Sequence, residues 1–112
     1  MKLARDEVPL GTFEEQVMLA VLRTASDAYG MTVRREIEDV TGREIAVGAV
    51  YATLDRLEAK ELVASKRSTI DGVSRRLFSI TAAGGRALAE TRSMRERLWQ
   101  GIDLRRLLGA AG

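Results

Sequence analysis

The sequence runs Val47-Gly-Ala-Val-Tyr-Ala-Thr-Leu-Asp-Arg-Leu-Glu58 and then changes from a helical to an alternating pattern of apolar residues. The alternating part consists of Leu62-Val-Ala-Ser-Lys-Arg-Ser68 and Arg75-Arg-Leu-Phe-Ser-Ile-Thr81, with Asp71-Gly72 between them. Asp-Gly between two such segments favours a hairpin turn, although we expect the loop to be longer than two residues. A helix is therefore followed by a strand, a basic turn and a second strand.

Two further helices are expected before this segment. Thr12-Phe-Glu-Glu15 has the pattern of a capping box, in which Thr12 begins the first helix and the Glu15 carboxylate reaches back to it. A second helix is expected over residues 31–40 and should end at Thr41-Gly42. Its inward side chains would be Val33, Ile37 and Val40. The whole order predicts a winged helix-turn-helix, a mainly α fold with a small two-stranded β wing.

The helix over residues 47–58 should turn one face to the core and the other to solvent. Its core positions repeat at helical spacing and are Val47, Val50, Leu54 and Leu57. The opposite face is small and nearly uncharged at its start, and it comprises Gly48, Ala49, Ala52, Thr53 and Arg56. Such a face permits close approach to the base edges and phosphates of DNA, and a helix N-terminus attracts phosphate. A tight crossing between two helices would explain Gly48 equally well.

Positive charge is unevenly distributed along the chain, although the net charge is only +2. The first 61 residues are net acidic, whereas the hairpin carries Lys66, Arg67, Arg75 and Arg76 against Asp71. A basic patch on a near-neutral protein suits a small phosphate footprint, on the backbone or in the minor groove. The alternative is an ordinary solvated surface. The predicted DNA contacts are these four basic residues together with Gly48, Ala49, Tyr51, Ala52 and Thr53.

The composition of the chain limits the classes of protein and the kinds of site that are possible. The chain has 112 residues, of which 46% are hydrophobic and 30% charged, and this fits a single globular domain. It contains no cysteine and no histidine, which excludes a disulfide framework and a thiolate or imidazole metal site. The sequence has neither a secretory signal pattern nor an apolar span of membrane length. We therefore expect a cytoplasmic protein, which would be associated with the bacterial nucleoid when bound to DNA.

Catalysis is not expected either. The chain has no imidazole or thiol to act as base or nucleophile, and it has no glycine-rich phosphate loop. The carboxylate clusters at Glu14-Glu15 and Glu36-x-Glu38-Asp39 lie on helices with apolar opposite faces, so we interpret them as solvated or dimer-facing charges. The sequence thus predicts no enzyme activity, no metal and no cofactor.

A long helix is expected after the hairpin, from Ala82 to Leu108, with Thr81 as its N-cap. Apolar positions along it repeat at close to heptad spacing, which would form a stripe that a small domain cannot bury. We interpret it as a coiled-coil-like dimerisation helix; packing back on the first helix is the alternative, and both can hold. The predicted dimer contacts are Phe13, Val17, Leu88, Met94, Leu98, Trp99 and Ile102.

The chain then divides into three parts. These are an N-terminal arm over residues 1–11, a DNA-binding domain over residues 12–81, and a C-terminal dimerisation helix and tail over residues 82–112. Gly101 within the last part marks either a bend or the end of the regular helix.

Several short motifs occur together at characteristic separations. They are Tyr29-Gly30, Gly48-Ala-Val-Tyr51, Leu54-Asp-Arg-Leu-Glu58, Arg75-Arg76 leading to Ile80-Thr81, and Gly84. In these features the chain resembles the PadR family of winged helix-turn-helix transcriptional regulators over about residues 10–90, and its short C-terminal part resembles the compact branch. The resemblance implies a homodimeric repressor that binds double-stranded DNA at an inverted-repeat operator and is often released by a small molecule.

The resemblance also implies roles for single residues. Tyr51 is expected at the phosphate backbone, or alternatively as a brace between two helices, and Arg56 is expected to be structural, paired with an acidic neighbour. The chain departs from the family at three places. Glu61 stands where glycine is common, so the turn there should differ; Ala52 replaces a frequent proline; and Leu77-Phe78 replaces an aromatic pair, which leaves a leaner wing.

An effector is implied in the same way. Related dimers hold aromatic or drug-like ligands between the C-terminal and first helices, so the possible partner is a small hydrophobic or aromatic molecule. Trp99 is the candidate for stacking on it, since the chain has one tryptophan. A lone tryptophan in an apolar stripe equally fits an interface anchor. The alternative functions are a winged helix used for protein interaction and a small-molecule sensor with little DNA specificity.

Overall fold

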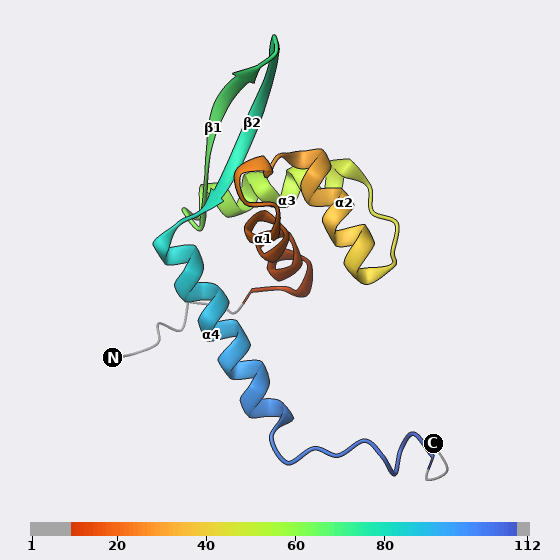
Figure 1. The fold of residues 1–112 in the computed structure, drawn as a ribbon. Coiled ribbons are helices and arrows are strands. Elements are labelled where there is room, and N and C mark those ends of the chain that lie inside the picture. The colour runs from red at the N-terminus through yellow and green to blue at the C-terminus, as the bar shows by residue number, and fades with distance from the viewer. Residues whose placement is uncertain (1–9, 110–112) are drawn as a thin grey trace.

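The computed structural model describes residues 10–109, so the predicted N-terminal arm lies outside the described residues except for its last two. Its elements are α1 (Thr12–Thr24), the 3-10 turn η1 (Ala25–Asp27), α2 (Gly30–Thr41), α3 (Val47–Ala59), β1 (Val63–Ile70), β2 (Val73–Ile80) and α4 (Ala82–Trp99). Figure 1 shows α1, α2 and α3 packed together, with the β1–β2 hairpin and α4 leaving them in opposite directions. The predicted mainly α fold with a two-stranded wing is confirmed.

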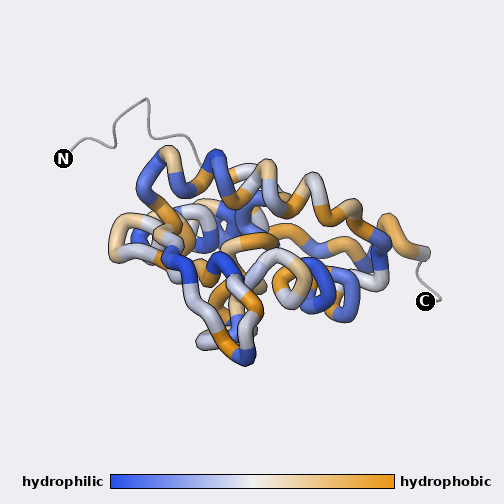
Figure 2. The backbone as a smooth tube through the Cα atoms, turned by 90° about the horizontal axis from the view of Figure 1, so that it is seen from above, coloured by the Kyte–Doolittle hydropathy of each residue, from blue (hydrophilic) through white to orange (hydrophobic). Residues whose placement is uncertain are grey.

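One apolar core lies where the three helices meet the base of the hairpin. Its buried side chains are Val17, Met18, Ala20, Val21, Ala28, Val33, Ile37, Val50, Leu54, Leu57, Val63 and Phe78. The helical members recur three or four residues apart, so each helix turns one stripe inward, and Figure 2 shows the resulting alternation of apolar and polar stretches along the chain. Val40, expected to point inward, is instead 60% exposed, because the core ends before the last turn of α2.

The first helix begins as predicted at Thr12, but its cap is one residue earlier than expected. Gly11 is the N-cap, and its amide donates a hydrogen bond to Oε1 of Glu14 at 3.0 Å. The prediction of a capping box formed by Thr12 and Glu15 is therefore wrong. Glu15 faces inward and is 8% exposed, so it is not the solvated charge that its cluster indicated.

The wing hairpin closes with the tightest possible loop. Ile70 pairs with Val73, so the loop contains two residues, Asp71 and Gly72, and the expected longer loop is wrong. Both loop residues have left-handed backbone angles, φ 54° and φ 77°. Two consecutive positive φ values are typical of the type I′ turn, whose twist matches that of the flanking strands. The wing is consequently a regular ladder up to its tip.

The turn from α3 into β1 keeps a glycine-like backbone even though it has no glycine. Glu61 has φ 63°, a left-handed backbone angle that glycine adopts most readily. Thr81 holds this turn: its hydroxyl donates to the Glu61 carbonyl at 2.7 Å and its amide to the Leu62 carbonyl at 3.1 Å. The base of the wing is thereby closed onto the start of α4.

The last helix is shorter than predicted. Thr81 caps it as expected, accepting a hydrogen bond from the Gly84 amide at 2.9 Å. The helix ends at Trp99 and not at Leu108, because the chain leaves the helical conformation at Gln100, with ψ 128°. Gly101, with φ 81°, completes a turn that is closed by a hydrogen bond from the Ile102 amide to the Trp99 carbonyl at 2.9 Å. Among residues 10–109, no helix is long and apolar enough to cross a membrane.

As far along as Arg95, α4 packs on α1 and on the residue Leu10 before it, within the protomer. The Thr91 hydroxyl is buried and accepts a hydrogen bond from the Leu10 amide at 3.2 Å. Arg95 donates to both oxygens of Glu15, at 3.0 Å and 2.6 Å. The alternative that α4 folds back on the first helix thus holds for this part, while its far end leaves the domain (Figure 1).

Candidate nucleic-acid interface

The start of α3 presents a bare surface. Gly48, Ala49 and Ala52 are exposed, and a Cβ added at Gly48 would meet no other described atom within 4 Å. The tight helix crossing that could have explained Gly48 is therefore absent among the described residues. A smooth helical face without long side chains can approach DNA closely.

Thr53 does not belong to this surface. It is 2% exposed, because positions 50, 53, 54 and 57 together form the buried stripe of α3. Its hydroxyl accepts a hydrogen bond from Nη2 of Arg56 at 3.1 Å. The expectation that Thr53 contacts DNA is corrected accordingly, and Thr53 instead fixes Arg56 along the helix.

Tyr51 joins α3 to the start of α2. Its ring lies so close to Gly30 that a Cβ added there would be 2.1 Å from the ring carbon Cζ. The glycine is therefore required for this contact, which explains physically why Tyr-Gly and a tyrosine 21 residues later form one motif. Tyr51 remains 37% exposed, so the same side chain braces two helices and offers part of its surface to a ligand.

Arg75 continues this surface onto the wing. Its guanidinium lies over the ring of Tyr29, 4.2 Å from the centroid, a cation–π contact. The Phe78 amide donates to the Ala28 carbonyl at 2.8 Å and holds β2 against the residue before Tyr29. Lys66 pairs with Leu77, which places it on the same face of the ladder as Arg75.

Arg76 points to the opposite face of the wing and is already engaged. It donates to Oδ1 of Asp55 at 2.8 Å, to Glu58, and to the Ser65 hydroxyl at 3.1 Å. These partners hold the wing against the C-terminal half of α3. The prediction that Arg76 is free to reach phosphate is therefore corrected, because its guanidinium bonds to two carboxylates. Hydrogen bonds from Ser65 and Arg76 hold the pKa of Glu58 below its usual value.

This cluster predicts a pH dependence. Because the folded pKa of Glu58 is depressed, its contribution to stability is present above the ordinary value of 4.5 and is lost as the pH falls further. Arg76→Gln should lower the free energy of unfolding at pH 7 by about 1 kcal/mol or less, and the difference from wild type should shrink towards pH 3. Urea titrations at several pH values measure it. Arg67→Gln, directly opposite in the ladder, is the control and should show no such trend.

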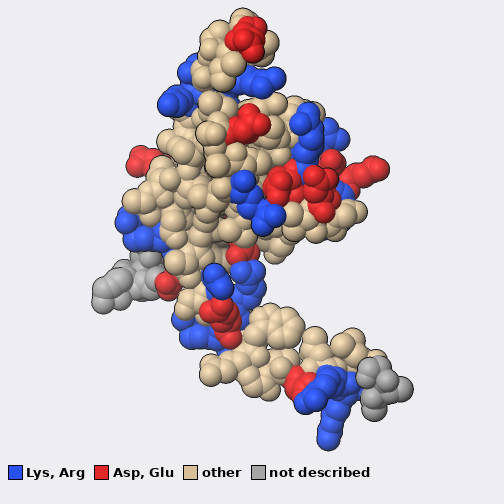
Figure 3. Space-filling model, viewed as in Figure 1, with Lys and Arg blue, Asp and Glu red and all other residues tan. Residues whose placement is uncertain are grey.

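The remaining wing cations are available. Lys66, Arg67 and Arg75 are exposed and form no ion pair with any described residue. Figure 3 shows basic side chains on both sides of the wing below its tip, with an acidic group at the tip where the turn carries Asp71. A strip thus runs from the start of α3 through Tyr51 and Tyr29 to Arg75. Residues 10–109 contain no cluster of acidic side chains that could hold a metal.

Comparison with known proteins places this geometry in a family. The sequence profile described as the transcriptional regulator PadR-like family matches residues 18–90. The chain belongs to this PadR-like family. Transcriptional regulator Rv3488 of Mycobacterium tuberculosis is 37% identical over 84 residues, which cover 73% of this chain and 78% of that protein. Because it belongs to this family, the chain is a transcriptional regulator, and the resemblance that we drew from its motifs is confirmed.

Solved structures agree with the assignment. RosR of H. salinarum is 26% identical with a TM-score of 0.65, and the match covers 96% of this chain and 91% of that one. A PadR family transcriptional regulator from Eggerthella lenta is also 26% identical, with a TM-score of 0.62 and 85% of each chain covered. The match to RosR covers nearly the whole of this PadR-like chain, so it includes α4 as well as the winged-helix core.

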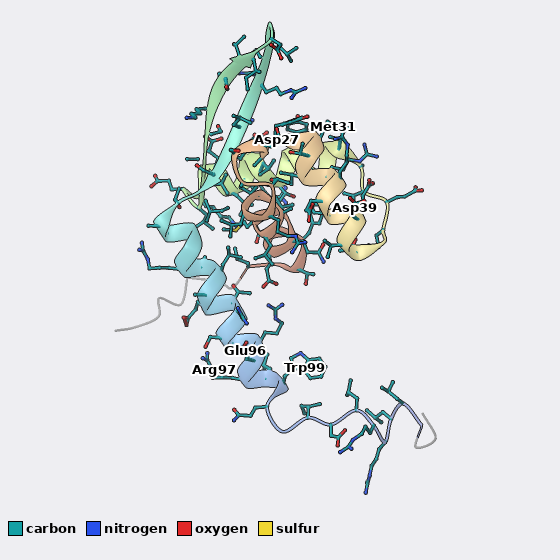
Figure 4. All side chains as sticks on the ribbon, in the orientation of Figure 1. Asp27, Met31, Asp39, Glu96, Arg97 and Trp99 are labelled. Carbon is teal, nitrogen blue, oxygen red and sulfur yellow. The ribbon has the colours of Figure 1, made fainter. Side chains whose placement is uncertain are left out.

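The residues predicted at a dimer interface fall into three groups in this PadR-like regulator. Val17 is fully buried in the protomer core, so it cannot contact a second copy, and its inclusion is corrected. Phe13, Leu88 and Met94 are half-buried. Leu98 is 72% exposed, Trp99 54% and Ile102 56%, and Figure 4 shows Trp99 at the end of α4, away from the three-helix core.

Proposed function

We propose that this PadR-like regulator is a sequence-specific DNA-binding protein, a repressor that acts as a homodimer on an inverted-repeat operator. Residues 12–81 would bind DNA and residues 82–112 would dimerise. The observation that carries the proposal is the continuous strip from Gly48 through Tyr51 and Tyr29 to Arg75, because it joins a bare helix start to unpaired positive charge.

We expect different parts of this strip to contact different parts of the DNA. The start of α3 would enter the major groove, where Gly48, Ala49 and Ala52 allow its backbone to approach the bases. Tyr51 and Arg75 would contact phosphates on one side, and Lys66 and Arg67 would reach the flanking backbone from the wing. Arg76 would position the wing relative to α3 and would not contact phosphate itself.

The test is fluorescence anisotropy of the protein on labelled DNA from upstream of its own gene, across a salt series and against a scrambled duplex. Arg75→Ala should weaken binding of the dimer by at least about tenfold, because one phosphate contact is lost in each of its two subunits, and should reduce the slope of log affinity against log salt by about 1.8. Arg86→Ala, an exposed arginine on α4, is the matched control. Equal losses for both variants would contradict the placement of the interface.

Gly48→Ala separates stability from binding. The position is helical and open, so alanine should raise the free energy of unfolding by up to about 1 kcal/mol. The new methyl group would stand between α3 and the DNA, so affinity for the same duplex should fall several-fold. Urea denaturation and anisotropy measure the two effects. A more stable variant with unchanged affinity would show that this face does not approach DNA.

We also propose that a small hydrophobic or aromatic molecule releases the repressor by binding beside Trp99. The exposed indole at the end of α4 supports this, because its face is accessible for stacking. Titration of aromatic compounds against tryptophan fluorescence tests it directly, since the chain has a single tryptophan. Quenching that is accompanied by loss of DNA binding is the expected result.

A further inference from the structure

The first turn of α3 lacks a side-chain cap. Its N-cap is Ala46, whose methyl group cannot accept the hydrogen bond that a serine or aspartate in this position takes from the helix backbone. Among residues 10–109, no atom accepts a hydrogen bond from the amides of Val47 and Gly48 either. Contacts outside the helix therefore have to hold its start in place.

Two charged side chains of α2 hold the residue just before this cap. Oε2 of Glu38 accepts a hydrogen bond from the Ile45 amide at 2.8 Å, and Nε of Arg34 donates to the Ile45 carbonyl at 2.8 Å. Arg34 and Glu38 lie one helical turn apart, and Nε of the arginine is 3.4 Å from Oε2 of the glutamate. Both backbone polar groups of Ile45 are thus bonded to one face of α2, an arrangement that we call the Ile45 clamp.

The Ile45 clamp fixes the direction in which the chain enters α3. The Ile45 side chain packs against the apolar core, which holds the residue in place. Apolar contacts are non-directional, so they do not set the orientation of the peptide groups on either side of the residue. The two hydrogen bonds do set it, because each needs a donor and an acceptor that are well aligned. Figure 1 shows this connection running back beside α2 before it enters α3.

Recognition of bases depends on the placement of α3 more strongly than attraction to phosphate does. Hydrogen bonds to base edges weaken steeply when donor and acceptor are misaligned, whereas the phosphate backbone attracts positive charge without accurate alignment. Gly48 and Ala49, which we place against the bases, follow Ile45 within four residues. A change in the course of the chain at Ile45 would therefore move this part of α3 directly.

We propose that Arg34 and Glu38 are positioning residues, which act through the backbone of Ile45 to set the orientation of α3 that base recognition needs. The inference rests on the proposed sequence-specific DNA binding and gives a role in it to two side chains outside the DNA strip. Neither side chain has to touch DNA. Glu38 makes the sharper case, because removing an acidic group near DNA favours nonspecific attraction, whereas losing the clamp weakens specific binding.

Fluorescence anisotropy tests this difference in sign on a duplex that the wild-type chain enriches from a random-sequence pool. Glu38→Ala should weaken binding to that duplex about tenfold and leave binding to its scrambled version unchanged or slightly stronger. Glu44→Ala is the matched control, because it removes the same charge from an exposed position next to Ile45. It should not weaken binding to either duplex. Equal effects of the two variants on the enriched duplex would overturn the proposal.

Arg34→Ala separates positioning from a direct contact with phosphate. It should also weaken binding to the enriched duplex about tenfold, but the slope of log affinity against log salt should stay the same, because no phosphate contact is lost. The double variant with Glu38→Ala should lose little more than either single variant, since both act on Ile45. Arg34→Lys keeps a charged donor and should recover part of the affinity. A slope reduced by about 1.8 for the dimer would show that Arg34 binds phosphate itself.

Amide hydrogen exchange of the DNA-free protein measures the clamp independently of DNA binding. The Ile45 amide should exchange at least about tenfold faster in Glu38→Ala than in wild type or Glu44→Ala, while the Leu54 amide in the core stays protected in all three. Weaker specific binding without faster exchange at Ile45, or faster exchange with unchanged binding, overturns the positioning role alone. A wild-type chain that enriches no duplex overturns the proposed DNA recognition as well.

Discussion

Gly84→Ala is expected to lower the free energy of unfolding by about 3 kcal/mol. A Cβ at this position would lie 2.1 Å from the Leu62 carbonyl oxygen and 2.9 Å from the Ile80 side chain. The carbonyl is part of the backbone and also accepts a hydrogen bond from the Thr81 amide, so no side-chain rotation relieves the clash. Either α4 or the turn before β1 must move.

Thermal unfolding followed by circular dichroism measures this loss, which corresponds to a fall in Tm of roughly 15 °C for a domain of this size. Gly85→Ala is the matched control one residue further along the helix, where the structure leaves open space among the described residues. It should be neutral or stabilising by up to about 1 kcal/mol, because alanine is the better helix former. Equal effects at the two positions would contradict the packing of α4 on the base of the wing.

Leu98→Glu is expected to convert the protein to a monomer and to lower its affinity for an operator by at least about a hundredfold. Leu98 is 72% exposed in the protomer, so glutamate should not unfold the monomer. In a two-fold dimer the substitution would bury two carboxylates without partners, which costs several kcal/mol. Each monomer would then bind a half-site alone with its own wing and α3.

Sedimentation equilibrium and anisotropy on the same duplex measure the two losses together. Ala89→Glu adds the same charge to an exposed position nine residues earlier, on the opposite side of α4, and it should leave both quantities unchanged. A monomeric Leu98→Glu protein that keeps full operator affinity would contradict a dimeric mode of binding. A dimeric one would show that α4 lies outside the interface.

The parts of the fold that local patterns determine were predictable from the sequence. Val50, Leu54 and Leu57 lie on the buried face of α3 as their spacing predicts. Asp71-Gly72 correctly marked the position of the hairpin. Only the length of its loop was misjudged, because the two strands continue up to the turn itself. At Gly101 the sequence left two interpretations open, a bend within α4 or the end of its regular part, and the second is correct. A glycine alone does not distinguish the two.

The errors involve contacts between residues far apart in the chain. Glu15 and Arg95 are 80 residues apart, and no spacing rule pairs them, so Glu15 was assigned to a solvated cluster. Arg76 and its neighbour Arg75 look equivalent in sequence, but the pleat of β2 sends one to Asp55 and Glu58 and the other to Tyr29. Strand alternation could have separated the two arginines, while their partners depend on how the wing packs.

The most direct test of the central claim is selection of DNA duplexes from a random-sequence pool by the purified full-length chain. The proposed recognition by two α3 helices predicts that an inverted repeat is enriched, with half-sites about one helical turn apart. The enriched sequence should lose its advantage when Arg75→Ala or Leu98→Glu is used for the selection. A folded, dimeric wild-type protein that enriches no sequence over the starting pool would contradict sequence-specific DNA binding.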